Sequence, residues 1–134
     1  MKIIPFALVL CSLAFAGCTS ASRNQKQDNP GYTTAAADKY GSDASFHFNE
    51  DSSYVLIKKQ PKSSADNPYP LLQFFVFDIR QNRTIFEDSL PMATVLWENN
   101  ENIRVNITQG QVEEGSSGSG GYIFNVRTIK KIPL

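Results

Sequence analysis

The sequence of 134 residues predicts an all-β domain, either a single antiparallel meander sheet or a small β-sandwich of about six or seven strands. Two observations predict it. After Gly41, short apolar runs rich in aromatic and β-branched residues are separated by turn-forming clusters about every eight to twelve residues. None of these runs has the apolar spacing of an amphipathic helix, so we expect no helix within the domain.

Seven segments are expected to form the strands: 46–48, 53–59, 71–79, 84–87, 93–98, 103–108 and 122–129. The strongest is 71–79, LLQFFVFDI, because apolar residues occupy both parities and neither face is suited to water. We place it centrally in the sheet or between two packed layers. Residues 103–108 alternate between apolar and polar, which is typical of a strand with one buried face. Ser89-Leu90-Pro91 is expected to interrupt the pattern.

Two long connections are the best candidates for a binding rim, because long loops on small domains often carry function. Residues 61–70, PKSSADNPYP, contain three prolines and several turn formers, and residues 109–121 are rich in Gly and Ser. Aromatic side chains are enriched at binding hot spots. We name Tyr69, Trp97 and Tyr122 as candidate rim residues. Tyr32 and Tyr40 are further candidates for aromatic residues outside the core, although most aromatic residues are expected to fill it.

The first 18 residues, MKIIPFALVLCSLAFAGC, are typical of an export signal. Lys2 supplies the positive start, and residues 3–15 form an apolar run of about a dozen residues. A membrane-spanning helix needs about 20 apolar residues. We therefore expect residues 1–17 to be a signal peptide that is removed.

Phe15-Ala16-Gly17-Cys18 resembles the lipobox of bacterial lipoproteins, with Phe15 standing where Leu is usual. The resemblance implies that Cys18 is lipidated on its sulfur and becomes the first residue of the mature protein. The alternative uses Ala14-Phe15-Ala16 as an ordinary signal-peptidase site and releases a protein that begins at Gly17. Because Cys11 is lost with the signal, Cys18 would be an unpaired thiol in an oxidising compartment. Lipidation accounts for this cysteine better than simple release does.

The same resemblance implies a location in the cell envelope. Residue 19 is Thr and not Asp, which by the sorting rule of enterobacterial lipoproteins favours the outer membrane. The domain would face the periplasm or the cell surface. Residues 18–43 are then the lipidated N-terminus followed by a flexible tether, because they are polar and poor in large apolar residues. A helical turn over residues 35–40 is the alternative for part of this segment. The all-β domain would occupy residues 44–134.

Charge and cysteine content exclude several classes of function. Without Lys2 the mature chain has 12 basic and 13 acidic residues, and neither sign is concentrated in one stretch. Nucleic-acid binding needs a basic stripe, so it is not expected. No disulfide is available to the mature chain, and the domain must be held together by its core.

No catalytic constellation is recognisable. His47 is the single histidine, lies between two Phe and is expected to be an exposed strand residue. No set of residues has the spacing of a transition-metal site, a calcium loop or a nucleophile elbow. We therefore predict no catalytic residue, no cofactor and no metal.

The leading hypothesis is a lipid-anchored envelope protein whose β-domain binds a protein or glycan partner without catalysis. Lipoproteins that inhibit lysozymes resemble the chain in size, export and β-content, although their disulfide pattern is missing; a small envelope enzyme or enzyme regulator is thus the alternative. A third hypothesis, a subunit that needs a partner chain, rests on the two-sided hydrophobicity of 71–79. Residues 74–107 also resemble one β-propeller blade, from which we take only an antiparallel meander.

Overall fold

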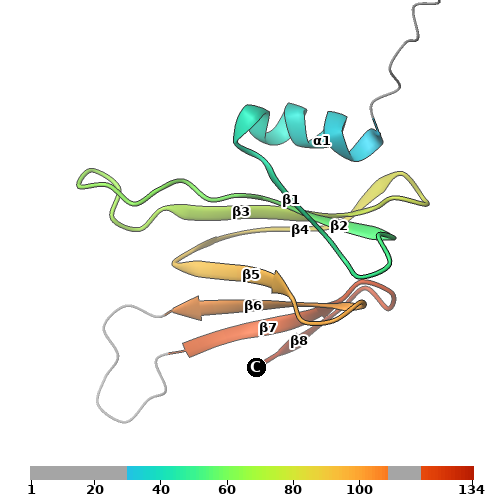
Figure 1. Cartoon of the computed structure of the whole chain (residues 1–134). Helices are drawn as coiled ribbons and strands as arrows, with labels where there is room; N and C mark the ends of the chain where they lie inside the picture. The colour runs from blue at the N-terminus through green and yellow to red at the C-terminus, as the bar shows by residue number, and fades with distance from the viewer. Residues whose placement is uncertain (1–29, 109–118) are drawn as a thin grey trace, which may run out of the picture.

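The computed structural model describes residues 30–108 and 119–134, which form two stacked four-stranded antiparallel sheets and one helix (Figure 1). Sheet A contains, in spatial order, β1 (Ser45–Phe48), β2 (Tyr54–Lys59), β3 (Leu71–Asp78) and β4 (Arg83–Pro91). Sheet B contains β5 (Ala93–Trp97), β6 (Asn102–Thr108), β7 (Ser119–Asn125) and β8 (Lys130–Pro133). Each sheet is a meander in sequence order. The all-β prediction is confirmed, and the structure is a sandwich of eight strands.

The main core lies between the two sheets. Alternate residues of the strands point into this space, and from β3 they are Leu72, Phe74 and Val76, all completely buried. Sheet B contributes residues such as Val105 from β6, and the ring of Phe86 on β4 stacks on Phe124 of β7 with the centroids 4.0 Å apart. Burial of an apolar side chain of this size stabilises the fold by about 1.5–3 kcal/mol.

A helix covers the outer face of sheet A as a third layer (Figure 1). Helix α1 (Gly31–Tyr40) leads into a short 3-10 turn, η1 (Gly41–Asp43). Tyr32, Ala36 and Tyr40 follow one another at four-residue intervals and therefore lie on one helix face, which packs on a second core cluster. In sheet A this cluster consists of Val55, Ile57, Phe75 and Phe77.

The structure differs here from the expectation of a flexible tether through residue 43. An isolated helix of ten residues is marginal in water, so its own sequence gave only a weak signal. The apolar outer face of sheet A stabilises it. This packing also explains the two-sided hydrophobicity of β3, since one face meets sheet B and the other meets α1. The second face of β3 is thus covered within the chain itself.

Two strands, β4 and β7, have boundaries that differ from those expected. β4 continues through Ser89 to Pro91, where Leu90 pairs with Leu72 and Pro91 lies opposite Leu71. Proline is accepted there because β4 is an edge strand. The expected strand 122–129 is β7, which begins earlier, at Ser119 within the expected loop 109–121, and ends at Asn125. The chain then turns back into β8, which was not expected from the sequence. The Asn125 side chain accepts hydrogen bonds from the backbone N–H of Arg127 and Thr128 and fixes this turn.

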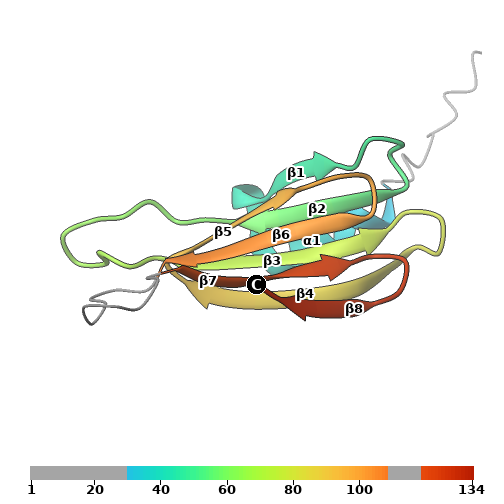
Figure 2. The same cartoon turned by 90° about the horizontal axis from the view of Figure 1, so that it is seen from below.

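The sandwich has two different ends (Figure 2). Four short turns meet at one end, which we call the turn end: residues 49–53, 79–82, 98–101 and 126–129. The opposite end carries the long β2–β3 connection, residues 60–70, which we call the arm. Helix α1 starts at the turn end, where the space a Gly31 side chain would need is filled by Asn82. It finishes toward the arm, since Asp43 is 3.6 Å from the Lys59 ammonium at the end of β2.

Candidate functional site

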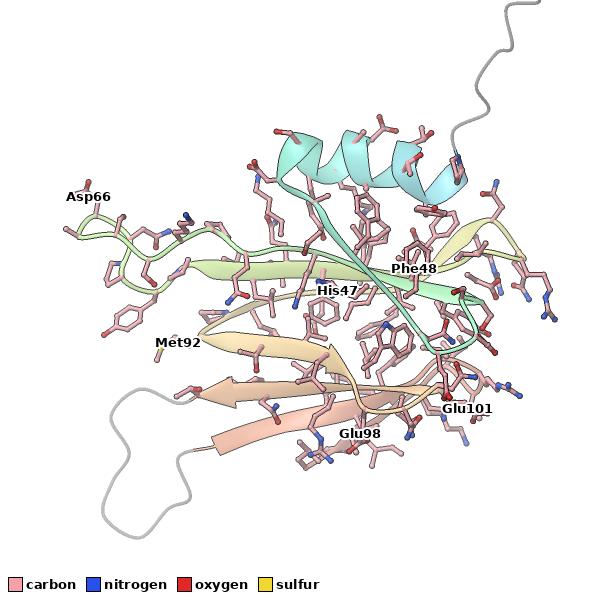
Figure 3. The ribbon with its side chains drawn as sticks, in the orientation of Figure 1. His47, Phe48, Asp66, Met92, Glu98 and Glu101 are labelled. Carbon is pink, nitrogen blue, oxygen red and sulfur yellow. The ribbon has the colours of Figure 1, made fainter. Side chains whose placement is uncertain are left out.

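The arm is the most exposed described part of the domain. Every residue from 60 to 69 is exposed, and the segment projects past the ends of the strands with Asp66 at its tip (Figure 3). The sequence predicts a loop here, and this loop is one of the two candidates for a binding rim. The structure shows it as a long projecting loop rather than a flat rim.

Local interactions give the arm a defined shape. The backbone N–H of Ser64 donates to the Asn67 carbonyl at 3.1 Å, and the N–H of Asn67 donates back to the Ser64 carbonyl at 3.2 Å. The Ser64 hydroxyl accepts a further hydrogen bond from the N–H of Asn67. Asn67 and Tyr69 each precede a proline, which restricts both residues to extended conformations. These hydrogen bonds and the prolines restrict the conformations that are open to the arm.

Tyr69 is the aromatic residue of this arm and is 63% exposed. It lies between Pro68 and Pro70, whose rings fix their own φ angles. A tyrosine side chain offers a large contact area with few rotatable bonds, and it loses little conformational entropy on binding. Of the three residues named from the sequence for a binding rim, Tyr69 has the position that contact with a partner requires.

Trp97 lies elsewhere, on the edge strand β5, and is partly buried. Its indole Nε1–H donates to the backbone carbonyl of His47 at 2.7 Å, and its ring packs against the main core. These contacts join the edges of the two sheets. Trp97 therefore has a structural role. It ends β5 next to the 98–101 turn, whereas Tyr69 precedes β3 at the opposite end of the sandwich.

Tyr122 is not a rim residue, because only 4% of it is exposed. Its hydroxyl donates to Asp88 Oδ2 at 2.5 Å, and the Lys131 ammonium lies 3.8 Å from its ring centroid. Burial, followed by the hydrogen bond and charge of Asp88, raises the pKa of Tyr122 well above its ordinary value. Tyr122 and Phe124 are two residues apart in the sequence and therefore share one apolar face of the strand. This spacing indicates a core position for Tyr122.

A polar cleft of about 320 Å³ opens at the turn end, lined among others by Asp51, Asp78, Arg80 and Arg127. Arg127 Nε lies 3.0 Å from Glu101 Oε1, so its charge is already paired. The lining thus carries two carboxylates, Asp51 and Asp78, and two guanidiniums, of which only that of Arg80 has no ion pair in the described residues.

Asn49 holds this end together, and the sequence analysis did not identify it. Its side chain is buried, and its two Nδ2 hydrogens are shared among oxygen acceptors of Asp51, Ser53 and Asn100, which lie 3.0, 3.1 and 2.9 Å from the nitrogen, while Oδ1 accepts from the N–H of Tyr54. The network connects the β1–β2 turn of sheet A to the β5–β6 turn of sheet B. Hydrogen bonds from Asn100 and then Ser53 hold the pKa of Asp51 far below its ordinary value. In the described part of the chain no buried side-chain nitrogen or oxygen is left without a partner.

A second hollow, of about 410 Å³, lies between the end of α1 and strands β3 and β4. Lys39 closes one side by an ion pair of 2.5 Å with Glu87, and its ammonium lies 5.7 Å from the ring centroid of Phe75. Burial, with a smaller contribution from the charge of Glu87, raises the pKa of Tyr40 to about 12. Tyr40 thus stays neutral and serves as packing for α1.

No catalytic arrangement is visible among the described residues. His47 is exposed on β1, and its Nε2 lies 3.3 Å from the Ser45 hydroxyl, but no carboxylate of the described residues hydrogen-bonds the ring. Desolvation, and then the charge of Lys58, lowers the pKa of His47. Within residues 30–108 and 119–134, no three His, Cys, Asp or Glu side chains are grouped as metal ligands.

The remaining sequence predictions lie outside the described residues. They concern the signal peptide, Cys18 and residues 109–118 of the Gly/Ser-rich connection. Among the residues that the structure describes, no helix is both long and apolar enough to cross a membrane.

In comparisons with known proteins, no family model, no curated protein and no solved structure matches this chain. The candidate site therefore rests on the geometry of the arm.

Proposed function

We propose that this protein is a lipid-anchored component of the cell envelope, held in the outer membrane through Cys18, and that its β-sandwich binds a protein or glycan partner without catalysis. The observation that supports binding is the arm, residues 60–70, with Tyr69 63% exposed between two prolines. The Phe15–Cys18 lipobox resemblance supports the anchor. Two or three acyl chains on one cysteine would suffice for stable attachment, at about 0.8 kcal/mol per buried methylene.

The arm has the properties of a preorganised binding element. Association costs free energy for every side chain and loop that must be ordered on binding, at about 0.5–1.5 kcal/mol per flexible side chain. The prolines and the Ser64–Asn67 hydrogen bonds reduce that cost before the partner arrives. Tyr69 would enter a pocket of the partner, with Lys62 and Asp66 near the rim of the contact.

The convex shape of the arm also supports the alternative, an enzyme regulator that resembles the lysozyme-inhibiting lipoproteins. A narrow projecting loop fits a concave surface, and enzyme active sites are clefts. In this alternative the arm blocks the cleft of an envelope or host enzyme. The same arm residues would make the contacts in both functions, so only the identity of the partner distinguishes a binding module from an enzyme regulator.

Replacement of Cys18 tests the anchor. In cells that make the Cys18→Ser variant, we expect the protein to leave the membrane fraction, and we expect palmitate to label the parent protein alone. A variant that stays in the membrane pellet, together with a parent that takes up no palmitate, would contradict the anchor.

Photo-crosslinking in intact cells tests the arm. A Tyr69→p-benzoylphenylalanine variant is expected to give a discrete adduct, which protease removes if the partner is protein and muramidase removes if it is cell-wall glycan. The matched control is Thr94→p-benzoylphenylalanine, because Thr94 is exposed on β5 at the outer face of sheet B. Equal adducts at both positions, or none at position 69, would contradict binding through the arm.

An activity assay distinguishes the enzyme regulator from the binding module. The mature chain is added to lysozymes acting on peptidoglycan, beside the same chain with Tyr69→Ala. Inhibition by the parent that is lost in the variant would identify an enzyme regulator. Unchanged activity with both proteins would leave the binding module as the supported function.

A further inference from the structure

The hollow beside the end of helix α1 lies over the outer face of sheet A. Three elements line it with, among others, Lys39 and Tyr40 from α1, Gln73 from β3, and Glu87 and Ser89 from β4. Gln73 and Ser89 lie opposite each other in the β3–β4 pairing, so their side chains project from the same face of the sheet. Phe75, two residues along β3, belongs to the cluster under α1, so this is the face that the helix covers.

Each charged side chain of the lining has a partner of opposite charge. The Lys39 ammonium lies 2.5 Å from Glu87 Oε2. The carboxylate of Asp88 accepts from the Tyr122 hydroxyl and lies 3.3 Å from the Lys131 ammonium, and both of these partners belong to sheet B. The charge of Asp88 is thus used between the two sheets. A ligand with a net charge would meet no uncompensated opposite charge in the hollow.

Three neutral polar side chains of the hollow have hydrogen-bonding capacity to spare. They are the Gln73 amide and the hydroxyls of Tyr40 and Ser89, and none of them makes a side-chain hydrogen bond to another described residue. The Tyr40 ring packs on Phe75 with the centroids 5.5 Å apart. Burial, more than the charge of Glu87, raises the pKa of Tyr40 to about 12, so its hydroxyl keeps the proton that it can donate.

These groups select the chemistry of a ligand. An apolar ligand would remove water from the amide and the hydroxyls without replacing their hydrogen bonds, which is unfavourable. An extended peptide is usually recognised by the backbone of a sheet edge, whereas this hollow lies over a sheet face and offers side chains. Sugar hydroxyls both donate and accept, as these side chains require, and the C–H groups of a sugar ring can pack on the apolar ring of Tyr40.

We propose that this hollow binds an uncharged saccharide through the Gln73 amide and the hydroxyls of Tyr40 and Ser89. Its volume of about 410 Å³ lies within the range of about 300–1,000 Å³ that is typical of small-ligand sites. The site goes beyond the binding proposed for the arm, and its assignment depends neither on the arm nor on the anchor at Cys18.

A titration followed by NMR spectroscopy tests the site. The protein is the mature chain with Cys18→Ser, which stays free of lipid. The uncharged probes are chitotriose and maltotriose, and the charged trisaccharides of the same length are trigalacturonate and fully deacetylated chitotriose. We expect at least one uncharged probe to cause saturable shifts in the backbone amide signals of residues 39, 40, 73 and 89. We expect both charged probes to bind more weakly than that sugar.

Gln73→Ala removes the amide and is expected to weaken binding of that sugar several-fold. Gln81→Ala makes the same change at an exposed position of the turn end and should bind like the parent. Tyr40→Phe keeps the ring, removes the hydroxyl and should also weaken binding, which provides a second measurement if the spectrum of Gln73→Ala shows that it is unfolded.

Four outcomes would overturn the proposal. The first is the absence of saturable shifts with either uncharged probe up to the millimolar range, and the second is that all shifts are confined to the arm. The third is tighter binding of a charged trisaccharide. The fourth is unchanged affinity in the folded Gln73→Ala and Tyr40→Phe variants.

Discussion

The indole Nε1–H of Trp97 donates to the backbone carbonyl of His47 at 2.7 Å, which connects β5, the edge strand of sheet B, to β1, the edge strand of sheet A. On the opposite edge, Tyr122 and Lys131 of sheet B both bond Asp88 of β4. Hydrogen bonds thus join the two sheets along both edges, in addition to the apolar core between them. This arrangement fixes how one meander sits on the other.

Trp97→Phe removes the indole donor and keeps an aromatic ring. We expect a loss of about 1 kcal/mol in the free energy of unfolding, because a hydrogen bond of this kind contributes about 0.5–1.5 kcal/mol. Urea denaturation followed by circular dichroism measures it. Tyr69→Phe, at an exposed position on the arm, is the control and is expected to be neutral. Equal stability of both variants would show that the Trp97–His47 bond contributes nothing.

Asn49→Asp replaces the buried amide donor with a carboxylate beside the Asp51 carboxylate and the Asn100 carbonyl. We expect a loss of at least about 2 kcal/mol, since a buried charge then faces acceptors in place of a donor. Asn106→Asp makes the same chemical change at a partly exposed position on β6. If the two variants unfold at the same urea concentration, the Asn49 network does not hold the turn end together.

Gly121→Ala is expected to destabilise the domain by more than about 2 kcal/mol. Gly121 has a positive φ of 154°, and an added Cβ would lie 2.1 Å from the carbonyl oxygen of Val105 on the neighbouring strand. Gly41→Ala serves for comparison, because its φ of 62° also disfavours alanine but its Cβ would meet no atom within 4 Å. We expect about 1 kcal/mol there. A smaller effect at 121 than at 41 in thermal unfolding would refute the close approach of β6 and β7.

Tyr122→Phe is expected to weaken the dependence of stability on acid pH. Although burial alone would raise the pKa of Asp88, hydrogen bonds from Tyr122, the Ser89 N–H and Lys131 outweigh it and lower that pKa. The folded carboxylate therefore contributes stability above its ordinary pKa, near 4, and this stability is lost as the pH falls through the lower folded value. Without the Tyr122 hydroxyl, the decrease in the urea midpoint between about pH 5 and pH 3 should be smaller. An identical decrease in parent and variant would exclude this coupling.

Ala36→Glu should detach helix α1 from sheet A. Ala36 is 1% exposed against the second core cluster, so a glutamate there would have to be buried or the helix displaced. Displacement exposes Phe75 and Phe77, and we expect increased binding of a hydrophobic dye together with self-association in sedimentation. Ala37→Glu, on the exposed side of the same helix, should behave like the parent. Dye binding that does not differ between the two variants would contradict the role of α1 as a cover.

The sequence by itself determined the elements with a strong local pattern. The alternation in residues 103–108 predicted a strand, and the two-sided hydrophobicity of 71–79 predicted a strand either central in the sheet or between two packed layers; both strands are confirmed, as β6 and β3. The loop over residues 61–70 followed from its prolines. These features depend on how side chains alternate along a strand and on the backbone restrictions of proline. Both can be recognised from residues that are neighbours in the chain.

Only the tertiary structure decided the rest. Helix α1 is too short to be stable alone and forms because Tyr32, Ala36 and Tyr40 meet the outer face of sheet A. Tyr122 and Trp97 were named with Tyr69 as rim residues, because an aromatic residue in a strand has the same local signature whether it binds a partner or fills a core. The packing of sheet A on sheet B places Tyr122 in the core and Trp97 at a joint between the sheets. The same packing leaves Tyr69 exposed on an arm that reaches beyond both sheets.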